Sequence, residues 1–180
     1  VWIEYGLQSA HERTLNFINR GHTCHDFVKA ANMTSERGIK VGVHLILGLP
    51  GETRDDMLKT ADKISRLPVS GIKFHVLHVL KDTKLAEYYR NGEIRLLTMD
   101  EYISILCDFL ERVDPGCVVF RLVSDAKEDC LIGPKWINDK SAVLSSVMKE
   151  LNNRGSYQGN VFKGREKRCG KGTGQVRQEL

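Results

Sequence analysis

The sequence predicts an α/β fold in which parallel strands are joined by crossover helices. Apolar runs of strand length alternate with amphipathic helical stretches along most of the 180 residues, which is typical of a parallel sheet. The segment GIKVGVHL begins at Gly38 and the similar GIKFHVLH at Gly71, a spacing of 33 residues that fits one strand, one helix and their loops. Four such units form half of a barrel or one side of an open sheet, and they leave strand edges uncovered.

The first strand is expected at residues 1–7, and the first helix begins at Thr23. Asp26 follows Thr23 at the spacing of a capping box, and Gly38 marks the end of the helix. The apolar stripe of this helix comprises Phe27, Val28 and Ala31.

The second strand is expected at residues 39–47 and the third at residues 72–79. Between them, Thr53 and Asp56 form a second capping-box pattern, and Pro68 ends the helix. Its apolar face comprises Met57, Leu58, Ala61 and Ile64.

A short helix is expected near residues 84–90. Thr98 and Glu101 then form a third capping-box pattern and predict a long helix, which a Pro-Gly pair ends. The last two elements are a strand at residues 117–123 and a helix at residues 141–151.

The composition, with 41% hydrophobic and 28% charged residues, is that of one globular domain. The sequence contains no run of about 18 apolar residues and no signal peptide, so we expect a cytoplasmic protein without a membrane segment. It starts without Met, directly on a strand pattern, which suggests a fragment whose upstream half is missing.

The net charge of +4 arises from the C-terminal stretch. Residues 154–180 hold seven basic and two acidic residues and few large apolar ones, so a flexible basic tail is predicted after a domain of residues 1–153. Such a tail can contact RNA or other phosphates electrostatically, although a solvated tail without a specific partner is the simpler interpretation.

The five cysteines are scattered along the chain, and no CxxC or CxxxCxxC spacing occurs. A metal site with all its ligands close together in the sequence is therefore not expected. Buried free thiols are the default in a cytoplasmic protein.

Ionisable residues interrupt all four apolar strands: Glu4 with Gln8 beyond it, His44, His75 and Arg121. Alternation along a strand places Glu4 and Gln8 on one face, and it places His44 opposite its apolar neighbours. Active sites of β/α barrels lie at the C-terminal ends of the strands, so we expect these residues to converge on one cavity there. For a single histidine, a buried polar group that a neighbouring strand or water satisfies is the favoured interpretation. The presence of such a residue on each of four strands favours a site.

The second strand ends abruptly in the turn GLPGET. Gly48 and Gly51 allow the backbone to approach a ligand, Pro50 fixes the turn, and the following helix points free N–H groups toward the strand ends. The pattern predicts a ligand-binding turn, although many α/β folds use Gly and Pro in such turns for structural reasons.

Taken together, these motifs resemble the second half of the radical S-adenosylmethionine (radical SAM) enzymes of the coproporphyrinogen oxidase and Elongator-like group, and most closely the YhcC/YtqA-type proteins. The resemblance rests on EYGLQSAHERTLNFINRGHT, GVHLILGLPGET, FHVLHVLKDTKLAEYY and RLVSDAKEDCLIGPKW. It covers about residues 1–153 and implies the C-terminal half of a partial (β/α)6 TIM-like barrel.

The resemblance also implies a chemistry. Such an enzyme reductively cleaves S-adenosylmethionine at a 4Fe-4S cluster and generates a 5′-deoxyadenosyl radical, and it takes its electron from a donor such as flavodoxin or ferredoxin. The cluster ligands are expected in the missing upstream segment and none in this chain, so the fragment alone is expected to be inactive. The substrate is unknown, and RNA is one candidate.

Several residues of this sequence match functional positions of the family. Gln8 matches a glutamine near the ribose hydroxyls of the cofactor, and Arg20 matches an arginine that pairs with the cofactor carboxylate. His44 stands where relatives often have an acid that binds ribose. The implied cofactor side also includes Glu4, Gly48, Pro50 and Gly51, and the implied substrate side comprises His75 and Arg121.

Two other functions are compatible with the sequence. One is a non-catalytic β/α binding module that docks a partner or RNA through the basic tail. The other is a β/α-barrel enzyme that binds phosphate at the GLPGET turn and uses His44 and His75 as acid and base. The residues upstream of Val1 distinguish these readings, because a CxxxCxxC motif there favours the radical enzyme.

Overall fold

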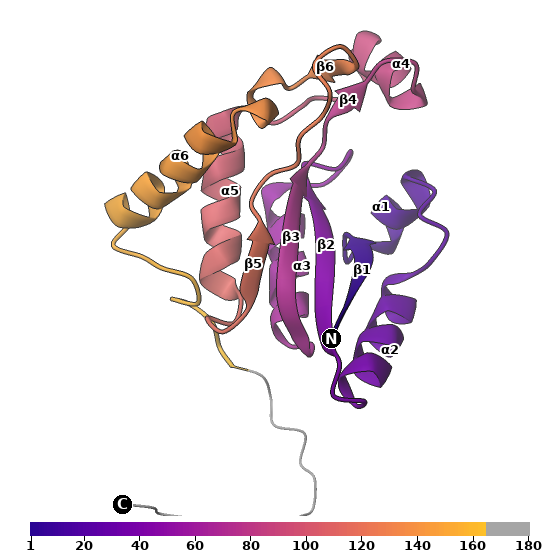
Figure 1. The fold of residues 1–180 in the computed structure, drawn as a ribbon. Helices are drawn as coiled ribbons and strands as arrows, with labels where there is room; N and C mark the ends of the chain where they lie inside the picture. The colour runs from indigo at the N-terminus through magenta and orange to yellow at the C-terminus, as the bar shows by residue number, and fades with distance from the viewer. Residues whose placement is uncertain (165–180) are drawn as a thin grey trace, which may run out of the picture.

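A four-stranded parallel sheet forms the centre of the computed structural model, which describes residues 1–164 (Figure 1). The strand order is β1-β2-β3-β5, and all three neighbouring pairs are parallel. The strands are β1 (Trp2–Gln8), β2 (Lys40–Leu47), β3 (Val69–Val76) and β5 (Val118–Arg121). The predicted fold class and the parallel pairing of the second and third strands are confirmed.

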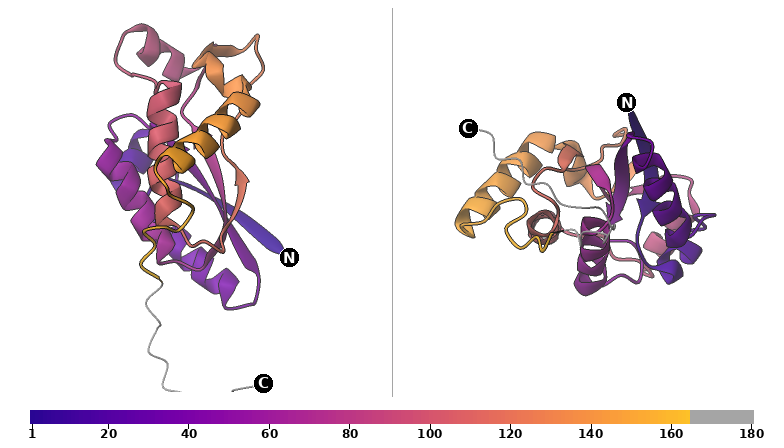
Figure 2. Two further views of the ribbon diagram at one scale, coloured as in Figure 1. Left: turned by 90° about the vertical axis from the view of Figure 1, so that its left-hand side faces the viewer. Right: turned by 90° about the horizontal axis from the view of Figure 1, so that it is seen from below.

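Helices cover one face of this sheet and leave the other face open within the described residues (Figure 2). The covering helices are α2 (Cys24–Ser35), α3 (Arg54–Ser65) and α5 (Met99–Arg112). Each begins with its predicted capping box, in which the threonine hydroxyl oxygen accepts a hydrogen bond from a backbone N–H one turn along. A further helix, α6 (Lys140–Asn153), packs on α5 away from the sheet (Figure 1).

The covered face of the sheet and the three helices form the hydrophobic core. Phe74 of β3 meets Phe109 of α5 edge to face, with ring centroids 5.1 Å apart. Tyr5 of β1 lies against Phe27 of α2, with centroids 6.4 Å apart. Alternate residues of β2 are buried in this core, as the strand pattern predicts: Val41, Val43, Leu45 and Leu47.

The third strand lies three residues earlier than predicted, at residues 69–76 instead of 72–79. The apolar pattern continues beyond β3, but the chain leaves the sheet there. Val79–Leu80 (β4) pairs antiparallel with Leu131–Gly133 (β6) and forms a separate two-stranded ribbon. Periodicity alone does not distinguish this departure from a longer strand, because both segments are apolar.

Three short elements complete the described part of the chain. The predicted short helix is present as α4 (Lys84–Arg90). Sequence reasoning missed α1 (Glu12–Phe17), which is too short to show an apolar stripe, and a 3-10 turn, η1 (Lys135–Asn138). None of the helices in residues 1–164 is long and apolar enough to cross a membrane.

The chain after α6 turns back onto α5, whereas the sequence predicts that a flexible tail begins at Arg154. The backbone N–H of Gly159 donates to the carbonyl oxygen of Leu110 at 3.0 Å, and that of Val161 donates to the carbonyl oxygen of Glu111 at 2.9 Å. The predicted boundary is therefore too early for the described residues.

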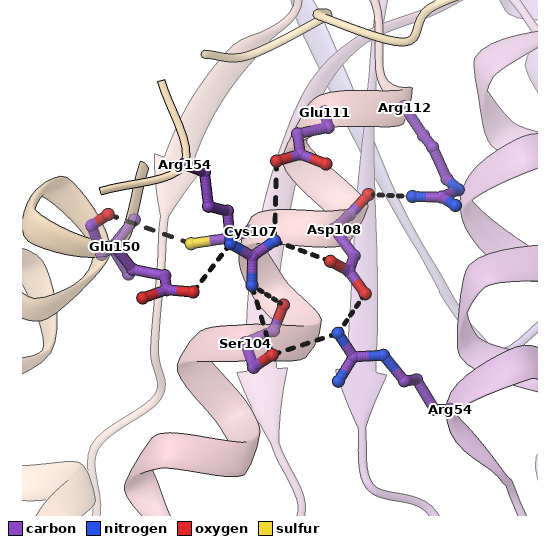
Figure 3. A network of polar contacts seen from close by, with 9 residues as sticks. Arg54, Ser104, Cys107, Asp108, Glu111, Arg112, Glu150 and Arg154 are labelled. Carbon is purple, nitrogen blue, oxygen red and sulfur yellow. Dashed lines mark hydrogen bonds and ion pairs between the residues drawn. The ribbon is translucent and has the colours of Figure 1, made fainter. Parts of the chain in front are cut away.

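Arg154 itself anchors this return. Its guanidinium lies 2.7 Å from carboxylate oxygens of Asp108 and Glu150 and 3.5 Å from Glu111 (Figure 3). The network ties α6 and the following segment to the end of α5. The remainder of the predicted tail, residues 165–180, lies outside the described residues.

Candidate functional site

On the open face, residues that lie opposite each other on neighbouring strands form rows across the sheet. In the row nearer the N-terminal ends of the strands, called the lower row, Glu4 lies opposite Gly42, and Gly42 lies opposite Gly71. The next row toward the C-terminal strand ends takes one residue from each strand: Gly6, His44, Lys73 and Arg121. The open face therefore presents polar side chains from all four strands.

Glycines in the lower row make room for an aromatic pair. Trp2 and Phe120 meet edge to face, with ring centroids 4.9 Å apart. A Cβ atom on Gly71 would overlap the Phe120 ring and lie 2.9 Å from Cζ3 of Trp2, and one on Gly42 would lie 3.3 Å from the Phe120 ring. The pair covers the N-terminal part of the open face, so the polar groups lie nearer the C-terminal strand ends, where β/α folds place their sites.

The Glu4 carboxylate joins three strands. Its Oε2 atom lies 2.6 Å from Nε2 of His44 and also accepts a hydrogen bond from Nζ of Lys73. The pKa of Glu4 is lowered, first by the bond from Lys73 and then by the bond from His44. The glutamate is thus ionised at neutral pH and held by two basic side chains.

His75 lies beside this group. Its ring stacks on that of His44 with centroids 5.5 Å apart, and its Nε2 atom is buried without a hydrogen-bond partner in the described part of the chain. Burial, followed by the positive charges of His44 and Arg121, lowers the pKa of His75 to about 4. His75 is therefore a neutral imidazole at physiological pH.

A bulge in β5 places Arg121 on the open face. Val119 pairs with Ile72 and Arg121 with Lys73, so β5 carries one extra residue, Phe120, between the two pairs. The extra residue turns both Phe120 and Arg121 toward the open face, as bulges beside functional sites often do. Arg121 also lies 3.9 Å from the carboxylate of Asp125.

The side chains of Gln8 and Arg20 both lie next to Gly6, near the end of β1. The Nε and Nη2 atoms of Arg20 donate to the Gly6 carbonyl oxygen at 3.0 and 2.8 Å, and His22 Nε2 lies 3.1 Å from the same oxygen. A Cβ atom on Gly6 would lie 2.5 Å from Nε2 of Gln8 and 2.8 Å from Nη2 of Arg20. Gln8 has a φ of 70°, a left-handed conformation that is uncommon outside glycine.

The GLPGET turn is tied to the loop that carries Gln8. Ser9 donates a hydrogen bond to the Glu52 carboxylate and accepts one from the backbone N–H of His11 at 3.0 Å. Burial raises the pKa of Glu52. Gly48 and Gly51 have φ values of 82° and 76°, so the glycines are required by the backbone of this turn.

One cavity lies where the turn meets the end of β1. It has a volume of about 640 Å³, and its lining includes Gln8, Arg20 and Pro50 with apolar side chains such as Ile46 and Leu77. The predicted cofactor residues Gln8, Arg20 and Pro50 are thus brought together.

The predicted single cavity for all four strands is not what the structure shows. His44, His75 and Arg121 do not line the cavity that Gln8 lines, and they form a second cluster with Glu4 and Lys73 on the same face of the sheet. The pairing of β1 with β2 shifts between Gly6 and Gln8, so Gln8 lies opposite Leu45. Gln8 is therefore separated from the row that contains His44.

Sequence reasoning missed four contributors to the site: Ser9, Glu52, Lys73 and the Trp2–Phe120 pair. Lys73 carries the same alternation signal as His75, from which it is separated by one residue, and Glu52 stands inside the GLPGET turn. The bulge that turns Phe120 toward the open face leaves no mark in the sequence pattern.

Within residues 1–164, no group of three or more His, Cys, Asp or Glu side chains is placed to hold a metal ion. Three of the cysteines in this part of the chain are buried and one, Cys130, is exposed. The described residues thus offer no ligand set for an iron–sulfur cluster.

Comparison with known proteins identifies two family models along the chain. Residues 1–64 match the model of the Radical SAM superfamily, and residues 69–153 match that of the Radical SAM C-terminal domain. The two models together cover both halves of the four-stranded sheet.

Individual relatives agree with these models. The chain is 44% identical over 162 residues to the uncharacterized protein YtqA of Bacillus subtilis (strain 168), covering 90% of this chain and 50% of YtqA, so it spans about half the length of that relative. It is 31% identical over 107 residues to a tRNA uridine(34) acetyltransferase of Methanocaldococcus jannaschii, covering 58% of this chain and 20% of that protein.

A solved structure shares the fold. The Elp3 protein of Methanocaldococcus infernus, with its N-terminus deleted, superposes with a TM-score of 0.77 at 23% identity, covering 88% of this chain and 37% of that one. This likeness supports the α/β architecture described above.

Proposed function

Because the chain belongs to the radical SAM superfamily, we propose that it forms the C-terminal part of the barrel of an enzyme that binds S-adenosylmethionine and cleaves it reductively. One observation carries the proposal: Gln8, Arg20 and Pro50 line a single cavity at the C-terminal strand ends. β/α-barrel enzymes bind their ligands at these ends.

Arg20 suits the carboxylate of the cofactor. Its bonds to the Gly6 carbonyl oxygen use two N–H donors and fix the direction of the guanidinium. A guanidinium has five N–H donors, so others remain for a carboxylate. Gln8, beside it, can donate to one ribose hydroxyl and accept from another.

The rest of the cavity suits the adenine end. Ile46, Leu49 and Leu77 supply an apolar wall, and flat aromatic ligands gain affinity from burial against such surfaces. Leu49 and Pro50 line the cavity from the turn, whose backbone depends on the positive φ values of Gly48 and Gly51. His44 and Glu4, bound to each other, lie on the same face and would contact the ribose side.

A 4Fe-4S cluster, when bound, supplies the one-electron reduction of S-adenosylmethionine. Its ligands would come from a part of the complete protein outside residues 1–164, and the electron from a donor such as flavodoxin or ferredoxin. The residues of this chain would bind and orient the cofactor and exclude water from it.

For the substrate we propose RNA. One relative is a tRNA uridine(34) acetyltransferase, and residues 165–180 contain five basic and two acidic residues. Basic segments attract the phosphate backbone in a salt-dependent manner. Binding of transfer RNA to the complete protein should therefore weaken steeply with salt, and deletion of residues 165–180 should reduce that salt dependence.

The phosphate-binding alternative has less support. The backbone N–H groups of Thr53 and Asp56 are already bonded inside the capping box at the start of α3. The pKa of Asp56 is lowered to about 2, first by the backbone of Thr53, so a carboxylate occupies the helix terminus and repels a phosphate. His75, with a pKa of about 4, is a weak base at neutral pH.

The test uses the complete protein with an anaerobically reconstituted cluster. We expect cleavage of S-adenosylmethionine to 5′-deoxyadenosine, and Arg20→Ala should weaken cofactor binding by about tenfold or more without changing the absorbance of the cluster. Arg37→Ala, at the exposed end of α2, is the matched control. Unchanged binding in Arg20→Ala would remove Arg20 from the site, and absence of cleavage would contradict the proposed function.

A further inference from the structure

The C-terminal part of the open face holds a second group of polar side chains, apart from the cofactor cavity. His75 of β3 lies two residues beyond Lys73, and Lys73 lies opposite Arg121 of β5. Because the bulge at Phe120 turns Arg121 onto the open face, three basic side chains from two neighbouring strands share one side of the sheet.

His75 has a donor or acceptor that the protein leaves unused. Its Nε2 atom is buried and unpartnered in the described part of the chain, whereas its ring is fixed by stacking on His44 at a centroid distance of 5.5 Å. Leaving a buried polar atom without a hydrogen bond is unfavourable, because the atom has lost its bonds to water. A ligand atom that bonds Nε2 would recover this cost.

The charges around His75 favour an anion as that ligand. Lys73 and His44 both bond to the Glu4 carboxylate. The Asp125 carboxylate lies 3.9 Å from Arg121 and 2.7 Å from Nζ of Lys140. Each of these two carboxylates therefore serves two basic groups. Burial is the main cause that depresses the pKa of His75, and the neighbouring basic side chains of His44, Arg121, His78 and Lys73 act in the same direction.

From this arrangement we infer that His75 and Arg121, with Lys73 beside them, bind an anionic group, a carboxylate or a phosphate, of the substrate. Arg121 supplies a planar donor fork whose side chain is 41% exposed, and the fork suits either group. The neutral imidazole of His75 supplies an uncharged hydrogen-bond donor at Nε2. That the anion belongs to a substrate rests on the proposed function, whereas the binding of an anion does not.

The position of this anion site distinguishes it from the cofactor cavity. Gln8 and Arg20 are at the end of β1, at one edge of the sheet, and Arg121 is on β5, at the other edge. A molecule whose anionic group is held at His75 and Arg121 would extend across β2 and β3 toward the cofactor cavity. The anion site would then fix the end of the substrate that is remote from the reacting atom.

The test is nuclear magnetic resonance of the histidine side chains of the 180-residue chain at pH 7, without S-adenosylmethionine or cluster. Sodium phosphate, sodium acetate and sodium chloride are added in separate titrations at equal ionic strength. We expect the His75 ring signals to shift and saturate with phosphate or acetate but not with chloride. His75→Gln assigns the signals, and Arg121→Gln should weaken the saturating binding by about tenfold.

Arg37→Gln is the matched control, since Arg37 is an exposed arginine at the end of α2, and it should bind the anion like the parent. Saturation with phosphate only assigns the site to phosphates, and saturation with acetate only assigns it to carboxylates. A His75 response equal to that with chloride, or one that Arg121→Gln leaves unchanged, overturns the anion site. Because no cofactor is present, the result is independent of whether the complete protein cleaves S-adenosylmethionine.

Discussion

Nε2 of His44 lies 2.6 Å from Oε2 of Glu4, and this contact links β2 to β1 across the open face. The same glutamate oxygen is bonded to Lys73 of β3, so one carboxylate connects three strands. Since the face above it has no covering layer in residues 1–164, the pair is partly solvated, with the two side chains 30% and 36% exposed. Its chemistry can therefore be tested by pH.

Replacing Glu4 with Gln should remove a pH-dependent contribution to stability. The pKa of Glu4 is below its ordinary value of 4.5 in the folded state, so its contribution is complete above about pH 4.5 and is lost as the pH falls through the folded-state pKa. Urea unfolding of the parent and Glu4→Gln should differ at pH 7, and the difference should shrink as the pH falls below 4.5 through the folded-state pKa. A constant difference at every pH would contradict this account.

His75 should give a linkage of the same sign as Glu4, at a higher pH. Its pKa falls from 6.5 to about 4 on folding, so the unfolded chain binds an extra proton between these values and the folded state loses stability as the pH falls from 6.5 to 4. The free energy of unfolding of His75→Gln should decline less steeply over this range than that of the parent. Equal slopes would show that His75 is not buried as described.

Gly71→Ala should destabilise the domain by about 1–3 kcal/mol, because the new Cβ atom overlaps the Phe120 ring. Thermal unfolding measures the loss. The double variant Gly71→Ala with Phe120→Leu should lose less than the sum of the two single variants, since the smaller side chain relieves the overlap. If the losses of the two single variants add exactly, the Phe120 ring is not in contact with the side chain at position 71.

Arg154→Gln should cost about 2 kcal/mol or more, because it leaves Asp108 and Glu111 partly buried beside each other without their guanidinium (Figure 3). Hydrogen exchange at Gly159 and Val161 should accelerate, as these amides bond to α5. Lys59→Gln, which removes an exposed ion pair with Asp55, is the control and should leave the free energy of unfolding nearly unchanged. Unaltered exchange in Arg154→Gln would show that the network does not hold the segment.

Much of the fold follows from local sequence signals. The three capping boxes at Thr23, Thr53 and Thr98 start their helices at the predicted residues, and strand alternation correctly separates His44 from the core residues around it. These features depend on residues close together in the chain, where side-chain chemistry and spacing determine the outcome.

The features that sequence reasoning missed depend on contacts between distant segments. β4 departs from the sheet because a partner strand some fifty residues later pairs with it, and Arg121 faces the open side because of a register shift against β3. Neither partner choice nor register is encoded in one segment alone. For the same reason, sequence reasoning expected one cavity for the candidate site residues and did not divide them into two clusters.

The aromatic pair below the polar rows has a practical consequence. The chain contains only two tryptophans: Trp2, 36% exposed on the open face, and Trp136, whose ring packs on Tyr102 and whose Nε1 atom donates to the Leu97 carbonyl oxygen at 3.3 Å. Trp2 thus belongs to the open face of the sheet, whereas Trp136 lies against α5. Intrinsic fluorescence of the Trp136→Phe variant therefore reports on the open face alone, and occupation of that face by a nucleic acid base or another chain would be visible as quenching or a blue shift of a single fluorophore.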